Sequence, residues 1–113
     1  MRLFPDNSFN ERTVSNEIAA GGGMVIYDGD ELVGYLLARW DREIMDITRF
    51  GVKVSHQGRG LGNRMLFDVI NSTGLDIILC VKKTNSRAIR LYLHHHFKIM
   101  GQLTNSWLMR RTT

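Results

Sequence analysis

Three closely spaced glycines give the sequence its clearest chemical signal. Gly58, Gly60 and Gly62 follow an apolar run, Ile47 to Val54, and precede a segment whose apolar residues recur at helical spacing. Glycine has no Cβ, so the backbone can adopt unusual dihedrals and lie close to a ligand. The first N–H groups of the following helix have no partner within the helix, and the helix dipole favours negative charge there. This order of strand, glycine turn and helix predicts a diphosphate site.

The spacing of the glycines decides which kinds of phosphate site are possible. A Walker loop needs Gly-x-x-x-x-Gly-Lys-Ser/Thr, which does not occur in this sequence. A dinucleotide-binding fingerprint needs its third glycine three places after the second, and Asn63 occupies that place. The pattern that is present is Gln-x-x-Gly-x-Gly, formed by Gln57, Gly60 and Gly62. Taken alone, this pattern is equally consistent with a tight strand-to-helix turn that binds nothing.

A second motif follows the next apolar run, Leu75 to Val81. Its residues are Asn85, Ala88, Leu91, Tyr92, His96 and Phe97. Together the two motifs resemble those of the GNAT superfamily of N-acetyltransferases. In that family an acyl-CoA-binding Q/R-x-x-G-x-G/A motif precedes Asn-x-x-Ala-x-x-Leu-Tyr-x-x-x-Gly-Phe. The resemblance covers roughly residues 24–110, and it departs from the family at His96, where a glycine is usual.

The resemblance implies an N-acetyltransferase that uses acetyl-CoA as co-substrate, without a metal. It implies direct attack of a primary amine on the acetyl group in a ternary complex. It also implies that two parallel strands, Ile47–Val54 and Leu75–Val81, diverge at their C-terminal ends and admit the pantetheine arm. The cofactor-binding residues that it implies are Phe50, Val52, Val54, Gln57, Gly58, Arg59, Gly60, Leu61, Gly62, Asn63, Asn85 and Tyr92. Gln57 is expected to shape the turn rather than take part in the chemistry.

Two residues are candidates for the catalytic steps. By resemblance, Tyr92 is the acid for the leaving thiolate; its alternative is a core tyrosine on a helix face. A phenol pKa of ~10 against ~8.5 for a thiol makes full proton transfer uphill by roughly 2 kcal/mol, so a hydrogen bond would already serve. Asp46 is the candidate base, with Glu43 as the near alternative, and either one is equally consistent with a solvent-facing charge at a strand end. Asn85 is also consistent with a helix N-cap.

The order of predicted elements gives the fold class. A helix is expected over about residues 7–20, strands over 24–27 and 32–40 around a turn at 28–31, and a strand over 47–54. A helix over 60–72, a strand over 75–81, a helix over 85–95 and a hairpin of 97–103 with 106–111 complete the chain. This is an α/β protein with a mixed, mostly antiparallel sheet and one parallel pair, flanked by helices. The resemblance implies that residues 1–113 form one GNAT-like domain, with a shortened N-terminal helical segment (residues 1–23) and a core (residues 24–113).

The N-terminal segment and the composition indicate which partners the protein can bind. Family members usually begin with a strand and two helices, so the short start predicts an acceptor site that is open or completed by a partner chain. The formal net charge is +4, but the cations are scattered, which argues against a nucleic-acid-binding arm. No apolar run approaches the ~20 residues of a membrane helix, no signal-peptide pattern is present, and Cys80 is the single cysteine. We expect a cytoplasmic protein with no membrane partner.

Three hypotheses stay open on the sequence. The first is an acetyl-CoA-dependent N-acetyltransferase. The second is a CoA-binding but inactive regulatory or interaction module, and the third is a small basic adaptor that keeps only the fold. The acceptor amine, whether a small molecule or a protein, is not readable. The oligomeric state is not readable either, although homodimers are usual in the family.

Overall fold

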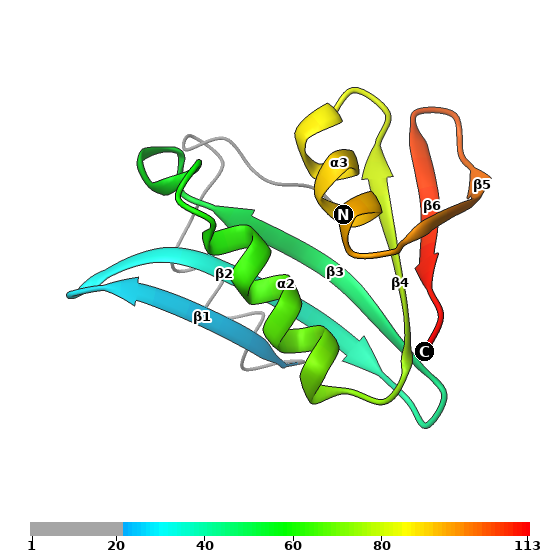
Figure 1. Ribbon diagram of the computed structural model, residues 1–113, viewed down its shortest axis with the longest axis horizontal. Coiled ribbons are helices and arrows are strands. Elements are labelled where there is room, and N and C mark those ends of the chain that lie inside the picture. Colours follow the sequence, from blue (N-terminus) through cyan, green and yellow to red (C-terminus); the bar gives the residue numbers. More distant parts are fainter. Residues whose placement is uncertain (1–21) are drawn as a thin grey trace.

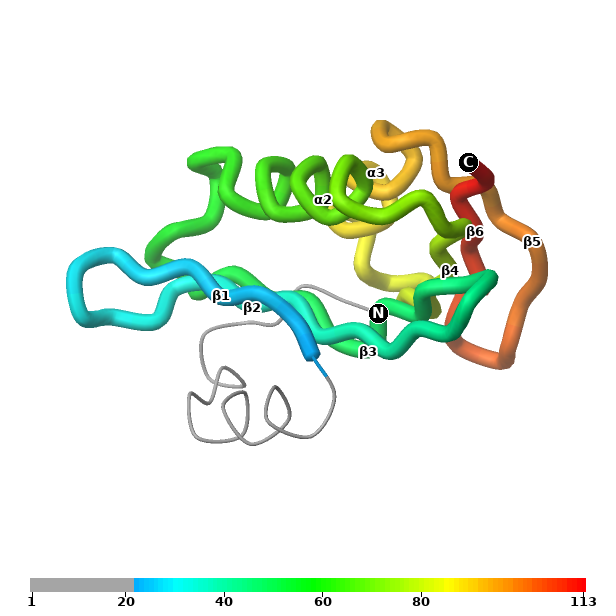
Figure 2. Tube along the Cα trace, turned by 90° about the horizontal axis from the view of Figure 1, so that it is seen from below, coloured from blue at the N-terminus to red at the C-terminus, as the bar shows by residue number. Residues whose placement is uncertain are grey.

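The computed structural model describes residues 22–113, which form a six-stranded sheet with two helices on one face (Figures 1 and 2). The helix expected over residues 7–20, and with it most of the N-terminal segment, lies outside the described residues. The elements are β1 (Gly23–Asp28), β2 (Glu31–Trp40), β3 (Ile44–Val52), α2 (Leu61–Ser72), β4 (Asp76–Lys82), α3 (Ser86–His94), β5 (Lys98–Gln102) and β6 (Ser106–Arg111). The strand order is β1-β2-β3-β4-β6-β5.

All neighbouring strands in the described sheet are antiparallel except β3 and β4, which are parallel. This confirms the mixed α/β sheet with one parallel pair. The turn between β1 and β2 also lies where it was expected, because Asp28 pairs with Glu31 and Gly29 adopts a φ of +62°. Within residues 22–113, no helix combines the length and the apolar character that crossing a lipid bilayer requires.

Strand β3 ends earlier than the sequence indicates. We expected a strand from Ile47 to Val54, but β3 spans Ile44–Val52, and Val54 opens a short 3₁₀ turn in which it is 48% exposed. The reason is hydrogen bonding. The N–H of Lys53 makes a last inter-strand bond to the carbonyl of Val33 at 2.8 Å, and the next bond is local, from His56 N–H to the Lys53 carbonyl at 2.8 Å. The strand assignment of Val54 was therefore wrong.

Strand β3 contains a β-bulge that no sequence feature predicted. Its pairing with β2 shifts because Leu37 faces Arg49 while Ala38 faces Ile47, so that Thr48 is an extra residue. In a regular strand, residues three apart point to opposite faces. The bulge lets Ile47 and Phe50 both enter the buried core, where they are 1% and 0% exposed. The bulge thus turns the second half of β3 toward the helices.

The parallel strands pair over a short distance and then diverge, as the resemblance implied. Only three register pairs join them, Ile44 with Asp76, Met45 with Ile77 and Asp46 with Ile78. Beyond that point β4 stays paired with β6 on its other side as far as Lys82, and β3 continues to Val52 beside β2. Figure 1 shows the two ribbons separating toward the end at which α2 begins.

Both helices have defined ends. The N-cap of α2 is Gly60, at a φ of +81°, and the N-cap of α3 is Asn85, whose side-chain oxygen accepts the N–H of Ala88 at 3.3 Å. At the other end of α3, Phe97 N–H bonds the Tyr92 carbonyl at 3.0 Å and His96 adopts a φ of +69°. This is a Schellman motif with histidine in the left-handed position. It accounts for the glycine that the family usually has at that place.

Candidate functional site

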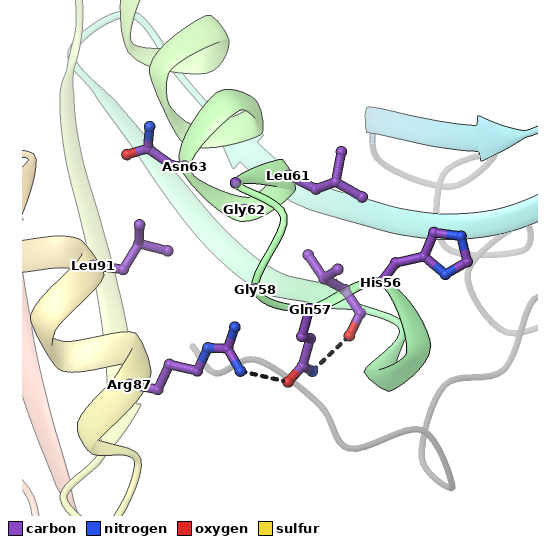
Figure 3. Close-up of a pocket in the computed structure, with 10 residues that line it drawn as sticks. His56, Gln57, Gly58, Leu61, Gly62, Asn63, Arg87 and Leu91 are labelled. Carbon is purple, nitrogen blue, oxygen red and sulfur yellow. Dashed lines mark hydrogen bonds between the residues drawn. The ribbon is translucent and has the colours of Figure 1, made fainter.

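A cavity of about 220 Å³ opens where α2 begins, between the glycine loop and α3 (Figure 3). Its lining residues are Val52, His56, Gln57, Gly58, Gly60, Leu61, Gly62, Asn63, Arg87 and Leu91. Seven of the residues predicted to bind the cofactor are among them: Val52, Gln57, Gly58, Gly60, Leu61, Gly62 and Asn63. The other five predicted residues, Phe50, Val54, Arg59, Asn85 and Tyr92, do not line this cavity.

The three glycines serve two different purposes. Gly58 and Gly60 both have a φ of +81°, a conformation that is strained for residues with a Cβ. Space is not the constraint at Gly60, because a Cβ there would meet no atom within 4 Å. At Gly62 a Cβ would lie 3.6 Å from both the Leu91 and the Phe50 side chains, so a larger residue would fill the gap between α2 and α3.

Gln57 braces the loop, in keeping with its expected role in shaping the turn. Its side-chain nitrogen donates to the carbonyl of Val52 at 2.8 Å, and its side-chain oxygen accepts from Nη1 of Arg87 at 3.0 Å. Figure 3 shows this chain of bonds from the end of β3 to α3. Arg87 was not predicted to belong to the site, because it occupies a variable position within the second motif.

A second brace joins the two helices at the other end of the cavity. The Asn63 side-chain oxygen lies 2.6 Å from Nε2 of His95, and the His95 carbonyl accepts from Arg111 at 3.1 Å. Burial, together with the nearby His94, Arg111 and His96, lowers the pKa of His95. A neutral His95 with its proton on Nε2 can donate to Asn63, which fixes the first turn of α2 against the end of α3.

The third brace ties the loop to the β1–β2 hairpin. The imidazole of His56 bonds Asp28 through Nε2 at 2.9 Å and the Ser55 hydroxyl through Nδ1 at 2.8 Å. Lys53 adds an ion pair with Glu31 at 3.4 Å. These contacts hold the 3₁₀ turn that leads from β3 to the glycine loop. They could not be read from the sequence, because Asp28 is far from His56 along the chain.

The charges around the cavity suit an anion. No acidic side chain lines it in the described region of the chain, whereas the Arg87 guanidinium does. The backbone N–H groups of the first turn of α2 add the positive end of the helix dipole. Arg59 is an exposed neighbour in the loop. The site therefore has the polarity that binding of an anion requires.

Tyr92 is buried beside this cavity rather than in its wall. The residue is 0% exposed, and its ring centroid lies 6.4 Å from that of Phe50 and 5.7 Å from that of Phe97. Burial raises the pKa of its hydroxyl well above the usual value, so the group stays protonated. Among the described residues this hydroxyl has no hydrogen-bond partner. A buried donor without an acceptor is costly, and it is a feature that a bound ligand would relieve.

Asp46, the other predicted catalytic residue, lies at the opposite end of the split. It is the last residue of β3 that pairs with β4, six residues before Val52, which is about 20 Å along a strand. Asp46 lines a separate, shallow hollow of about 270 Å³ together with Arg39, Trp40, Asp41 and Ile44. The alternative base, Glu43, is exposed in the β2–β3 turn. The glycine loop and the candidate base thus mark the two ends of the diverging pair.

Other groups add no metal chemistry to the described region. Residues 22–113 contain no group of three or more His, Cys, Asp or Glu side chains that could hold a metal ion. Cys80 is a half-buried free thiol in β4.

Comparison with known proteins decides the family. The sequence profile of the acetyltransferase (GNAT) family matches residues 2–97. The chain belongs to the GNAT family of acetyltransferases. No curated protein matches this GNAT chain significantly in sequence.

Solved structures agree with this GNAT fold. PH1933 from Pyrococcus horikoshii superposes with a TM-score of 0.78 at 24% identity, covering 90% of this chain and 73% of that one. Arabidopsis thaliana Naa50, in complex with a CoA-peptide bisubstrate analogue, superposes with a TM-score of 0.74 at 22% identity. The match covers 93% of this chain and 82% of Naa50. The PaiA N-acetyltransferase of Thermoplasma acidophilum, in complex with coenzyme A, superposes with a TM-score of 0.77 at 15% identity. The match covers 95% of this chain and 82% of the PaiA chain. At these identities the likeness establishes the fold.

Proposed function

We propose that this GNAT chain is an N-acetyltransferase that transfers the acetyl group of acetyl-CoA to a primary amine in a ternary complex. The observation that carries the proposal is the divergence of β3 from β4 after three paired residues, in a direction that leads to the glycine loop. When bound, acetyl-CoA supplies an acetyl group activated as a thioester.

The residues of the split and the loop fit such a co-substrate. A splayed pair of strands leaves backbone N–H and C=O groups without ladder partners, and an amide-rich arm can pair with them as an added strand would. Phe50 and Val52 offer this backbone, and Val54 begins the turn toward the diphosphate. The amides from Gly58 to Asn63 take the diphosphate at the start of α2.

Tyr92 is proposed as the hydrogen-bond donor to the departing sulfur. Its hydroxyl is protonated, buried and without a partner among the described residues, so it is available for an acceptor that the ligand brings. A backbone N–H near Val52 is proposed to polarise the acetyl carbonyl, as in an oxyanion hole. Holding acetyl-CoA and the amine together between β3 and β4 is proposed to supply much of the rate acceleration. Asn85 caps α3 and thereby sets the place of Tyr92.

Asp46 is proposed as the base, with Glu43 as the alternative. A lysine-like amine has a pKa of ~10.4, so removing its proton at pH 7 costs roughly 4–5 kcal/mol, which a nearby carboxylate offsets. Asp46 stands at the apex of the split, where β3 and β4 last touch. Because Asp46 lies about 20 Å along β3 from Val52, it can take the proton of the attacking amine only through a chain of water molecules.

Calorimetric titration with CoA, followed by a screen of amines with acetyl-CoA that records thiol release, tests the proposal. Small amines, lysine side chains and peptide N-termini belong in the screen. The peptide-containing analogue bound by Naa50 is the reason for including the last class. Binding with acetylation of one class supports the enzyme. Binding without turnover of any class favours a regulatory CoA-binding module, and absence of binding contradicts both.

A further inference from the structure

The guanidinium of Arg87 has a position in the cavity that the phosphate loop alone does not explain. Arg87 lies in the first turn of α3, on the far side of the cavity from the amides of α2 (Figure 3). Its Nη1 donates to the neutral side-chain oxygen of Gln57 at 3.0 Å. Its Nη2 lies 3.8 Å from where a Cβ on Gly58 would be. The side chain is therefore held across the mouth of the loop.

The charge of Arg87 is not balanced by a carboxylate among residues 22–113. None of the ion pairs in this part of the chain includes it, and no acidic side chain from the same residues lines the cavity. A guanidinium has five N–H donors in a planar fork that matches phosphate oxygens, and the Gln57 contact uses one of them. Nη2 carries two of the remaining donors and lies beside Gly58, in the loop that is proposed to bind the diphosphate.

We propose that Arg87 is a diphosphate ligand and that Gln57 is the residue that positions it. The inference rests on the proposed function. A diphosphate has two anionic centres, and the cavity has two sources of positive potential on opposite walls. The amides of α2 bind one centre, and the Arg87 fork binds the other. Gln57, the first residue of the glycine motif, links the two walls through its bonds to Val52 and Arg87.

The test is the CoA dissociation constant of Arg87→Gln, measured by calorimetry beside Arg90→Gln. Arg90 lies on the same helix, is exposed and does not line the cavity, so it controls for the loss of one charge. Losing a charge-assisted bond to phosphate should weaken binding by about tenfold for Arg87→Gln. The control should change it by less than about threefold. Arg87→Lys, which keeps the charge but not the fork, should fall between them.

A second ligand identifies which phosphate is bound. 3′-Dephospho-CoA retains the diphosphate and lacks the 3′-phosphate, so the penalty of Arg87→Gln should be as large with it as with CoA. A penalty that disappears with 3′-dephospho-CoA, or one no larger than that of Arg90→Gln, overturns the assignment while leaving the proposed function intact. Wild-type protein that binds neither ligand would instead overturn the proposed function together with this inference.

The positioning role of Gln57 is tested by a double-mutant cycle. If Gln57 acts through Arg87, then Gln57→Ala should weaken CoA binding in the wild-type background and have little further effect in the Arg87→Gln background. Thermal unfolding without ligand, recorded for each variant, shows which of them fold. Additive losses in affinity among folded variants would contradict the positioning role.

Discussion

The hydroxyl of Tyr92 makes a prediction in which stability and activity change in opposite directions. Phenylalanine keeps the ring and its contacts with Phe50 and Phe97 but removes a buried donor that has no acceptor among the described residues. An unsatisfied buried polar group costs ~1–3 kcal/mol, so Tyr92→Phe should raise the free energy of unfolding of the ligand-free protein by about 1 kcal/mol. For a chain of 113 residues that is a rise in Tm of about 4 °C.

Urea and thermal unfolding of the ligand-free protein measure this change. Tyr27→Phe is the matched control, because Tyr27 is 52% exposed on β1 and its hydroxyl can be hydrated. We expect the control to alter stability by less than ~0.5 kcal/mol. A clear loss of stability in Tyr92→Phe would show that the hydroxyl has a partner in the free protein, and the reasoning would be refuted.

The pH dependence of stability provides an independent check on the same group. Because burial raises the pKa of Tyr92 in the folded protein, the unfolded chain loses this proton first as the pH rises. The contribution of the Tyr92 proton to the free energy of unfolding is fully present below pH ~10. It falls by about 1.4 kcal/mol per pH unit above that pH. The Tyr92→Phe protein should therefore lose stability less steeply than wild type above pH ~10. In an acetyl-transfer assay, the Tyr92→Phe protein should turn over more slowly than wild type, while its affinity for CoA stays nearly unchanged.

Further substitutions test the helix ends, the loop and the candidate base. His96→Gly should stabilise the protein by ~0.5–1 kcal/mol in urea unfolding, because glycine removes the strain of the left-handed position. His94→Gly is the control: it lies within α3 and should destabilise the protein by ~1 kcal/mol. Gly60→Ala should cost ~1–2 kcal/mol and weaken CoA binding in calorimetry, while Gly74→Ala, at an open position without a positive φ, should do neither. Asp46→Asn should lower turnover by about a hundredfold without changing CoA affinity, and an unchanged rate would remove Asp46 from the mechanism.

Local patterns predicted the elements of the core because their signals lie within a few residues. The glycine spacing located the start of α2, and the second motif located α3, each within one residue of the bounds in the structure. The β1–β2 turn followed from the Asp-Gly pair at 28–29. The divergence of β3 and β4 was implied by the family resemblance and is present in the strand register.

What the sequence could not provide depends on contacts between distant segments. The bulge at Thr48 exists only in relation to β2, and β3 ends where its pairing with Val33 ends, so Val54 was assigned to the strand wrongly. Arg87 and His56 line the cavity because α3 and the β1–β2 hairpin approach the loop from opposite sides. A histidine in place of glycine at position 96 looked like a departure from the family until its positive φ was seen.

Hydrogen–deuterium exchange with and without CoA tests the central claim most directly, because it reads backbone amides segment by segment. We predict that CoA slows exchange in peptides that cover Gly58–Asn63 and the second half of β3, and leaves the β5–β6 hairpin unchanged. Saturating CoA that leaves both segments exchanging at their original rates would contradict the proposed binding mode.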